Sequence, residues 1–136
     1  RPWFRSSAVR ASEDPYIQSH YGEFFVGLES IRLLAANAAA VFDAAWSQGD
    51  SLDAQGRGHV AVTVATAKVA STRVGLELTS RLFETTGARA THGALRLDRF
   101  WRNLRVHSLH DPVDYKLQEL GNWALNDSYP QPSFYA

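Results

Sequence analysis

The side chains best suited to chemistry are concentrated between Arg81 and Pro112. This stretch holds six of the twelve arginines and three of the five histidines, and Gly87 and Gly93 bracket a short loop inside it. Beyond the loop, arginine recurs at every third position, and the stretch then closes on two histidines and an aspartate: Arg96, Arg99, Arg102, Arg105, His107, His110 and Asp111. Arginine binds carboxylate or phosphate through a fixed fork of donors, and histidine exchanges protons near neutral pH. The pattern predicts a region that binds an anion and moves a proton.

Charge is balanced over the chain as a whole. The 136 residues carry 14 basic and 14 acidic side chains, so no overall field favours nucleic acid or an anionic membrane. A chain of this length with 45% hydrophobic residues suits one globular domain with a core. Only two of the basic residues are lysines, and this arginine bias has two interpretations: specific anion sites, or a helical surface kept soluble by arginine.

Metal and thiol chemistry have little support in the sequence. The chain has no cysteine, which excludes thiol catalysis, disulfides and thiolate metal sites. No glutamate is followed by histidine three residues later, so the Glu-x-x-His pairs of a ferritin-like di-metal bundle are missing. His107 and His110 are three residues apart and, with Asp111, leave a zinc site as one alternative. We predict that no metal is bound.

The first long element should be a helix from Pro15 to about Gln48. Asp14 is a good helix cap, Pro15 suits the first helical position, and Gly49 suits the end. Apolar residues follow a strict spacing of four and three that lines one side of a helix, at Ile17, Tyr21, Phe24, Leu28, Ile31, Ala35, Ala38, Phe42 and Ala45. A helix of this length needs a partner of equal length, which favours a bundle.

Three further helices complete the prediction. A second long helix follows Asp53, its expected cap, and runs to about Thr86, where Gly87 stops it. A third covers about 95–109, and the pair Asp111-Pro112 opens a fourth, with Asp111 as its cap and four apolar residues buried: Val113, Leu117, Leu120 and Leu125. Residues 1–13 form an irregular arm and 126–136 an extended tail. The fold class is therefore all-α: an up-down four-helix bundle of two long helices followed by two shorter ones.

The chain contains no methionine and begins at Arg1, so we expect it to be the C-terminal piece of a longer protein. It shows no signal-peptide pattern and no long apolar run, the longest candidate being HVAVTVATAKVA at 59–70. We therefore expect a cytoplasmic protein without a membrane or nucleic-acid partner.

Residues 81–112 resemble the C-terminal helical domain of the acyl-CoA dehydrogenase superfamily. The segments FETTGAR and LDRFWRNLRVHSLHDPVDYK, with the opening RPW, resemble more narrowly its reduced-flavin-dependent monooxygenase branch, which includes dibenzothiophene monooxygenase. The resemblance covers nearly the whole chain and is strongest from Phe100 to Pro112.

The resemblance implies an enzyme built from an N-terminal helical domain, a middle β domain and a C-terminal four-helix bundle. Flavin lies between the last two domains, with help from a neighbouring subunit, and subunits associate through the bundles as a dimer of dimers. The chain 1–136 would be the last of these domains. It implies reduced, diffusible FMN supplied by a flavin reductase, with FAD as the alternative. The isolated fragment would be inactive.

The resemblance also assigns flavin-binding residues. Arg1 of RPW matches an arginine that binds the flavin phosphate region of an adjacent subunit. Thr86, Gly87, Ala88 and Arg89 match a glycine-rich turn that receives the neighbour's flavin tail, and Arg89 could hold a mononucleotide phosphate. The alternatives are a solvent-exposed loop residue for Arg89 and a chain end without a role for Arg1.

His110 is the main departure from the dehydrogenases. They carry Glu-Gly-Thr where this chain has His110-Asp111-Pro112, and in many of them that glutamate abstracts a proton from the substrate. In the monooxygenase branch the matching histidine faces the flavin and assists oxygen chemistry. The resemblance makes His110 the catalytic candidate and His107 its possible partner. The alternative for His110 is a helix-junction residue bound to backbone.

Three functions follow, and they differ in class. The leading one is a reduced-flavin-dependent monooxygenase that transfers one oxygen atom from O2 to an organic substrate. The first alternative is a true acyl-CoA dehydrogenase with its base elsewhere, which would pass electrons to an acceptor. The second is a non-catalytic helical assembly domain, which would show no response to flavin.

Overall fold

The computed structural model describes residues 2–134, and every regular element within them is helical. Four α-helices run from Pro15 to Trp46 (α1), Ala54 to Thr86 (α2), Asp98 to His110 (α3) and Val113 to Asn126 (α4). Short 3-10 turns lie at Ala11–Glu13, Gly49–Ser51, Ala88–Thr91 and Gly93–Leu95. The predicted all-α bundle of two long and two shorter helices is confirmed.

Side chains cap both long helices where the sequence predicted. Asp14 Oδ1 accepts hydrogen bonds from the amides of Tyr16 and Ile17 at 3.0 and 3.3 Å, and Asp53 Oδ1 accepts one from the amide of Gly56 at 2.7 Å. These carboxylates satisfy amides that have no partner inside the helix. The N-termini of α1 and α2 are therefore fixed locally by the sequence.

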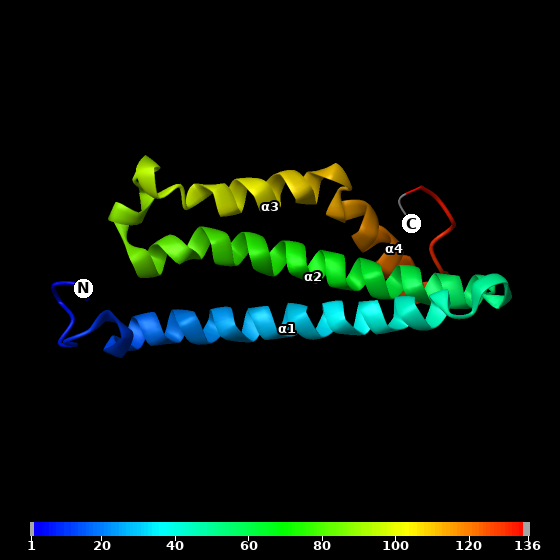
Figure 1. Ribbon diagram of the computed structural model, residues 1–136, viewed down its shortest axis with the longest axis horizontal. Coiled ribbons are helices and arrows are strands. Elements are labelled where there is room, and N and C mark those ends of the chain that lie inside the picture. Colours follow the sequence, from blue (N-terminus) through cyan, green and yellow to red (C-terminus); the bar gives the residue numbers. More distant parts are fainter. Residues whose placement is uncertain (1, 135–136) are drawn as a thin grey trace.

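The long helix α2 lies between the others (Figure 1). α1 runs antiparallel to it on one side, and α3 and α4 follow each other along another side. The register of this second packing is antiparallel, since Leu104 lies against Gly75, Asp111 pairs with Lys68, and Tyr129 lies over Gly58. Gly75 permits the first of these contacts, because a Cβ there would lie 2.6 Å from Leu104 Cδ2.

The core of the isolated chain is thin. Its buried apolar residues are mostly small: Phe24, Ala38, Ala45, Ala65, Val69 and Ala90. The predicted seam of α1 is only partly buried, because Tyr21, Leu28 and Phe42 remain about half exposed. Within residues 2–134, α1 packs mainly against α2, so the rest of its apolar surface has no cover.

Three predicted details of the short helices are wrong. α3 begins at Asp98 and not at Leu95, because Arg96 adopts a left-handed φ of 52° that separates the preceding 3-10 turn from the helix. Leu125 is 84% exposed, and it is Lys116 that α4 buries. Pro112, and not Asp111, occupies the cap position of α4, without a side-chain hydrogen bond.

The two ends of the chain differ in their packing. The arm leaves Trp3 and Phe4 largely exposed. The tail has no regular structure over its described part, yet Tyr129 stacks on Trp123 with ring centroids 4.2 Å apart, and Pro130 is buried. The tail therefore folds back onto the start of α2 and is not free.

The sequence was expected to contain no long apolar run, with 59–70 as the longest candidate. This expectation was wrong, because α1 contains a long apolar stretch. Among the described residues, α1 is the one helix long and apolar enough to cross a membrane by length and composition. The same test is passed by core helices of bundles, so this property alone is weak evidence for a membrane span.

Candidate functional site

His110 is the last residue of α3, and its side chain is exposed. Asp111 and Pro112 follow in extended conformations, with φ/ψ of −130°/101° and −62°/131°. Proline disfavours helix at the residue before it, which explains the break. The imidazole of His110 makes no hydrogen bond or ion pair with any described residue, so the helix-junction alternative, in which it binds backbone, has no support within residues 2–134.

His107 lies one turn earlier on α3 and is also exposed. Its ring has no hydrogen-bonding partner among the residues that the structure describes. Those same residues contain no group of three or more histidine, aspartate or glutamate side chains placed to share a metal ion. The zinc alternative for His107, His110 and Asp111 therefore finds no support in the described chain.

Asp111 pairs with Lys68 from the middle of α2. This pair explains why Asp111 is not the cap of α4, as predicted: its carboxylate turns to the ammonium group and away from the helix amides. The side chains are 24% (Lys68) and 19% (Asp111) exposed, so the pair is shielded from most of the solvent. The sequence gives no local signal for it, because 43 residues separate the two.

Thr86 is the last residue of α2, and Gly87, Ala88 and Arg89 form the turn that follows it; all four are exposed. Gly87 has φ 77° and ψ 177°, a conformation that suits glycine, and Ala88 opens a 3-10 turn. The guanidinium of Arg89 has no ion pair or hydrogen bond with a described residue. An exposed arginine beside a glycine turn has the chemistry to hold a phosphate. Arg1, the other predicted phosphate ligand, lies outside the described residues.

The Arg89 turn and His110 lie at opposite ends of α3 (Figure 1). At about 1.5 Å per residue, this 13-residue helix separates them by about 20 Å. A single chain thus does not gather the predicted phosphate ligand and the predicted catalytic histidine into one site.

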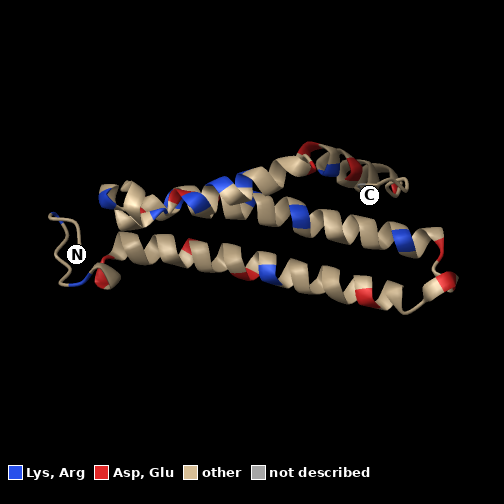
Figure 2. Cartoon of the chain, turned by 45° about the horizontal axis from the view of Figure 1, so that its top comes forward, with Lys and Arg blue, Asp and Glu red and all other residues tan. Residues whose placement is uncertain are grey.

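Most of the arginine series on α3 is engaged within the helix. Arg102 pairs with Asp98 at 3.1 Å, Arg99 lies 4.9 Å from the ring centroid of Phe100, and Arg105 lies 5.8 Å from that of Trp101. Figure 2 shows several basic residues close together on α3 and the end of α2, while others are spread over the remaining helices. These contacts favour the surface interpretation of the arginine bias over a row of anion sites.

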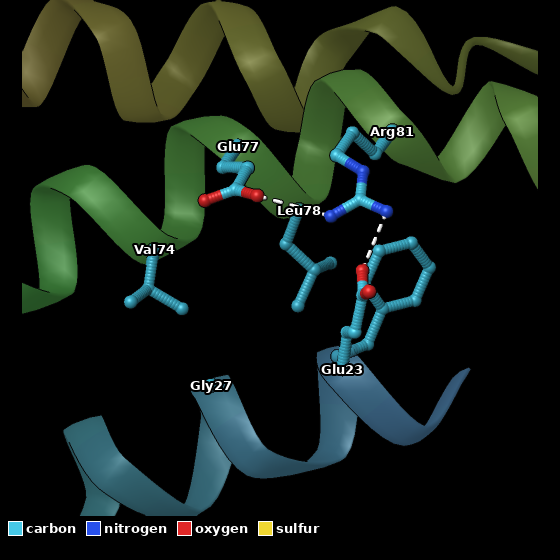
Figure 3. A pocket seen from close by; sticks show the side chains of 7 residues that line it. Glu23, Gly27, Val74, Glu77, Leu78 and Arg81 are labelled. Atoms are coloured by element: carbon cyan, nitrogen blue, oxygen red, sulfur yellow. Dashed lines mark hydrogen bonds and ion pairs between the residues drawn. The ribbon is translucent and has the colours of Figure 1, made fainter. Parts of the chain in front are cut away.

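Arg81 forms an ion-pair cluster that the sequence did not single out (Figure 3). Its guanidinium binds Glu23 at 2.6 Å, Glu77 at 3.0 Å and Glu84 at 3.2 Å, and lies 5.6 Å from the ring centroid of Phe24. Hydrogen bonds that Arg81 donates to Glu23, then Glu84 and Glu77, raise its pKa above the ordinary value. The helical spacing of Glu77, Arg81 and Glu84 was a usable signal, but the Glu23 contact depends on the fold.

The cluster borders a hollow of about 190 Å³ between α1 and α2, lined also by Gly27, Val74 and Leu78 (Figure 3). Ligand pockets usually measure about 300–1,000 Å³, so this hollow is too small for a flavin. A second hollow of about 450 Å³ lies between the start of α2 and the tail. Neither is lined by His110 or Arg89. A cofactor bound at His110 or Arg89 would therefore need other parts of the protein, or another subunit, to form the rest of its binding site.

The sequence matches the family described as acyl-CoA dehydrogenase, C-terminal domain, over residues 3–115. This covers most of the chain, which therefore belongs to that family.

Relatives place the chain more narrowly. It is 62% identical over its full length to a probable FMNH2-dependent monooxygenase, SfnC, of Pseudomonas putida, and 47% identical over 98% of its length to a dibenzothiophene monooxygenase of Mycolicibacterium goodii. The methanesulfinate monooxygenase MsuC of Pseudomonas fluorescens superimposes with a TM-score of 0.97 at 62% identity. A complex of TdsC from Paenibacillus sp. A11-2 with FMN and indole gives 0.95 at 44%.

The chain spans about a third of each of these proteins: 34% of SfnC, 32% of the dibenzothiophene monooxygenase, 35% of MsuC and 34% of TdsC. The superpositions on MsuC and TdsC include the whole of this chain. The predicted resemblance to the acyl-CoA dehydrogenase superfamily and its monooxygenase branch is confirmed.

Proposed function

We propose that this chain is the C-terminal bundle of a reduced-flavin-dependent monooxygenase that transfers one oxygen atom from O2 to an organic substrate. The observation that carries this proposal is the match over the full chain, at 62% identity and a TM-score of 0.97, to a methanesulfinate monooxygenase. The chain lacks the larger part of such an enzyme, so the activity belongs to the full-length protein.

The cofactor is reduced FMN. An FMN complex of TdsC has this fold at 44% identity, which supports FMN over the FAD alternative. Arg89 and the turn at Thr86–Ala88 offer an unengaged guanidinium beside an exposed glycine turn, which fits a flavin phosphate. Arg89 and His110 are separated by about 20 Å along α3. This separation supports the assignment of the Arg89 turn to the flavin of a neighbouring subunit, and not to the flavin beside His110 of the same chain. Arg1 would serve the same phosphate region.

His110 is the proposed catalytic residue. Bound reduced flavin supplies the electrons that activate O2. His110 holds and moves a proton at an imidazole nitrogen, which its exposed and unengaged position at the end of α3 allows. His107, one turn earlier, would orient it or the substrate. The glutamate that serves as base in many dehydrogenases is replaced here by His110, which argues against acyl-CoA oxidation.

The test uses the full-length enzyme with a flavin reductase as the source of reduced FMN. His110→Ala should lower turnover at saturating FMN by about 10²–10⁴-fold, the usual contribution of acid–base assistance. The measurement is oxygenated product formed per reduced FMN consumed. His59→Ala, an exposed histidine on the first turns of α2, is the matched control and should keep the wild-type rate.

Three outcomes would decide against this proposal or a part of it. Full coupled oxygenation in His110→Ala would remove the catalytic role of His110. Oxidation of an acyl-CoA by an external electron acceptor, without consumption of O2, would favour the dehydrogenase alternative. An intact protein whose properties are unchanged by flavin would leave only the assembly function.

We also propose a homo-oligomer, as a dimer of dimers, formed through the bundle. Support comes from α1, whose exposed large apolar residues include Tyr21, Phe25, Val26, Leu28, Leu33, Phe42 and Trp46. Exposed apolar surface of this kind is best covered by symmetric pairing of subunits. Supply of reduced FMN by a reductase in turn favours a cytoplasmic location, which fractionation of the native cells would test.

A further inference from the structure

The backbone around His110 is anchored on both sides while its ring stays free. On the α3 side, Leu104 lies against Gly75 and Ser108 is only 3% exposed. On the α4 side, that helix packs along α2. Between these anchors the chain leaves helical geometry at Asp111 and Pro112. Because the helical backbone hydrogen bonds are interrupted there, a side-chain contact is needed to fix the path of the chain at this break.

Lys68 supplies that contact through its ion pair with Asp111. It rises from the most buried face of α2, among Ala65, Val69 and Thr72, all of which are at most 9% exposed. A charged side chain is costly on such a face unless it is paired and hydrogen-bonded. The pair therefore holds Asp111, and with it the residue before it, at one place on α2.

We propose that Lys68 is a positioning residue for the monooxygenase reaction: by binding Asp111 it fixes the α3–α4 break and aims His110 at the flavin. This inference rests on the proposed function of His110. The break has no side-chain cap of its own, since Asp111 faces Lys68 and the cap position of α4 is a proline. Loss of the ammonium group would free Asp111, and the end of α3 would move with it.

The experiment compares full-length variants with reduced FMN at saturation. Lys68→Met keeps the length of the side chain and removes the charge, and it should lower turnover by roughly 10- to 100-fold, as misplacement of a reacting group does. The affinity for FMN should stay within about twofold of wild type, because by this proposal the phosphate site lies at the other end of α3. Lys68→Arg should recover much of the lost rate.

The double variant Lys68→Met/His110→Ala separates positioning from plain stability. If Lys68 acts through His110, the double variant should be no slower than His110→Ala alone, because residues that act as a unit are not additive. Lys116→Met is the matched control: this lysine also pairs with a carboxylate, Glu119 at 3.1 Å, and is shielded from solvent. It should lower the thermal midpoint without a comparable loss of turnover.

Three results would overturn the proposal. Lys68→Met could turn over within twofold of wild type, the losses of Lys68→Met and His110→Ala could multiply in the double variant, or Lys116→Met could lose turnover as much as Lys68→Met. If Lys68→Met does not fold, the variant Lys68→Met/Asp111→Asn, which removes both charges of the pair, replaces it. Its loss of turnover must then also be non-additive with the loss in His110→Ala. A normal rate in His110→Ala would instead refute the proposed catalytic role of His110, and this inference with it.

Discussion

Single residues of this chain fall into two groups, those that hold the bundle and those left open at its surface. Arg81 and Lys68 bind carboxylates on other elements, whereas Arg89 and His110 have no partner among the described residues. Exposed charged or titratable side chains that have no partner among the described residues are available to bind a cofactor or a neighbouring domain. This division directs the predictions for individual residues.

Arg89→Ala should weaken binding of FMN to the full-length enzyme. Loss of a hydrogen bond to a charged group corresponds to about 1.5–3 kcal/mol, or roughly a 10- to 150-fold higher Kd. A flavin titration measures it. Arg102→Ala is the control, since Arg102 is engaged with Asp98 and should leave the Kd unchanged. Equal affinities in the wild type and Arg89→Ala would leave Arg89 a plain surface residue.

The cap Asp14 should make stability depend on pH. A hydrogen bond with Ser6 and those from the amides of Ile17 and Tyr16 lower the pKa of Asp14 below its ordinary value. Because the folded pKa is the lower one, the stabilisation is complete above the ordinary carboxyl pKa and is lost as pH falls through the folded pKa. Asp14→Ala should lower the Tm by a few degrees at neutral pH.

The Tm difference between wild type and Asp14→Ala should then shrink as the solution is made acidic. Thermal unfolding of the full-length protein followed by circular dichroism over a pH series provides the measurement. Asp50→Ala, at an exposed position in the turn after α1, should show no such trend. A Tm difference that stays constant down to low pH would show that the carboxylate is not the stabilising form.

At the residue scale, the sequence was a good guide wherever the partner is local. Asp14 and Asp53 bind amides two or three residues away, and both caps were predicted. Asp111 has the same Asp-Pro signature as Asp14 but binds Lys68, 43 residues distant. Periodicity and capping patterns contain no information on such a partner, and for the same reason the contact of Glu23 with Arg81 was missed.

The connection between α2 and α3 shows how elements position the site. α2 ends at Gly87 with a positive φ, two 3-10 turns follow, and Arg96 is left-handed before α3 starts. The sequence predicted a glycine-rich loop here but not the two turns, because their short-range hydrogen bonds leave no periodic pattern. The path of this connection sets where Arg89 lies.

Gly87→Ala should destabilise this connection. Its φ of 77° with ψ of 177° lies in a region that side chains other than glycine rarely adopt, at a cost of about 1–3 kcal/mol. Chemical denaturation of the full-length protein should show the loss, together with weaker FMN binding. Gly93→Ala is the matched control, because no positive φ occurs there and a Cβ would meet nothing within 4 Å. Equal stability of the two variants would contradict the strain at Gly87.

The whole molecule exposes more surface than its mass requires. Its accessible area is 9906 Å², whereas a compact monomer of 15.1 kDa exposes about 7,100 Å². The excess is larger than one standard protein interface contributes from each side. The predicted apolar seam of α1 contributes part of this excess area, because several of its residues remain about half exposed. The sequence could not predict this exposure, since the periodicity of apolar residues does not tell whether the helix that covers them belongs to the same chain.

The isolated chain 1–136 should self-associate. Burial of the large apolar side chains of α1 favours pairing over a monomer in water. Sedimentation at several loading concentrations tests this, with Phe25→Glu on the exposed face of α1 as the disrupting variant and Tyr115→Glu on α4 as the control. A strict monomer at high concentration for the unmodified chain would contradict the proposed bundle interface.

The thin, alanine-rich contact between α1 and α2 has a consequence for how this domain melts. A bundle whose largest apolar side chains lie outside its own core gains much of its stability from whatever covers them. Its thermal midpoint should therefore rise with protein concentration, as mass action requires when folding and assembly are linked. On dilution, the unfolded fraction of the domain should increase even at constant temperature.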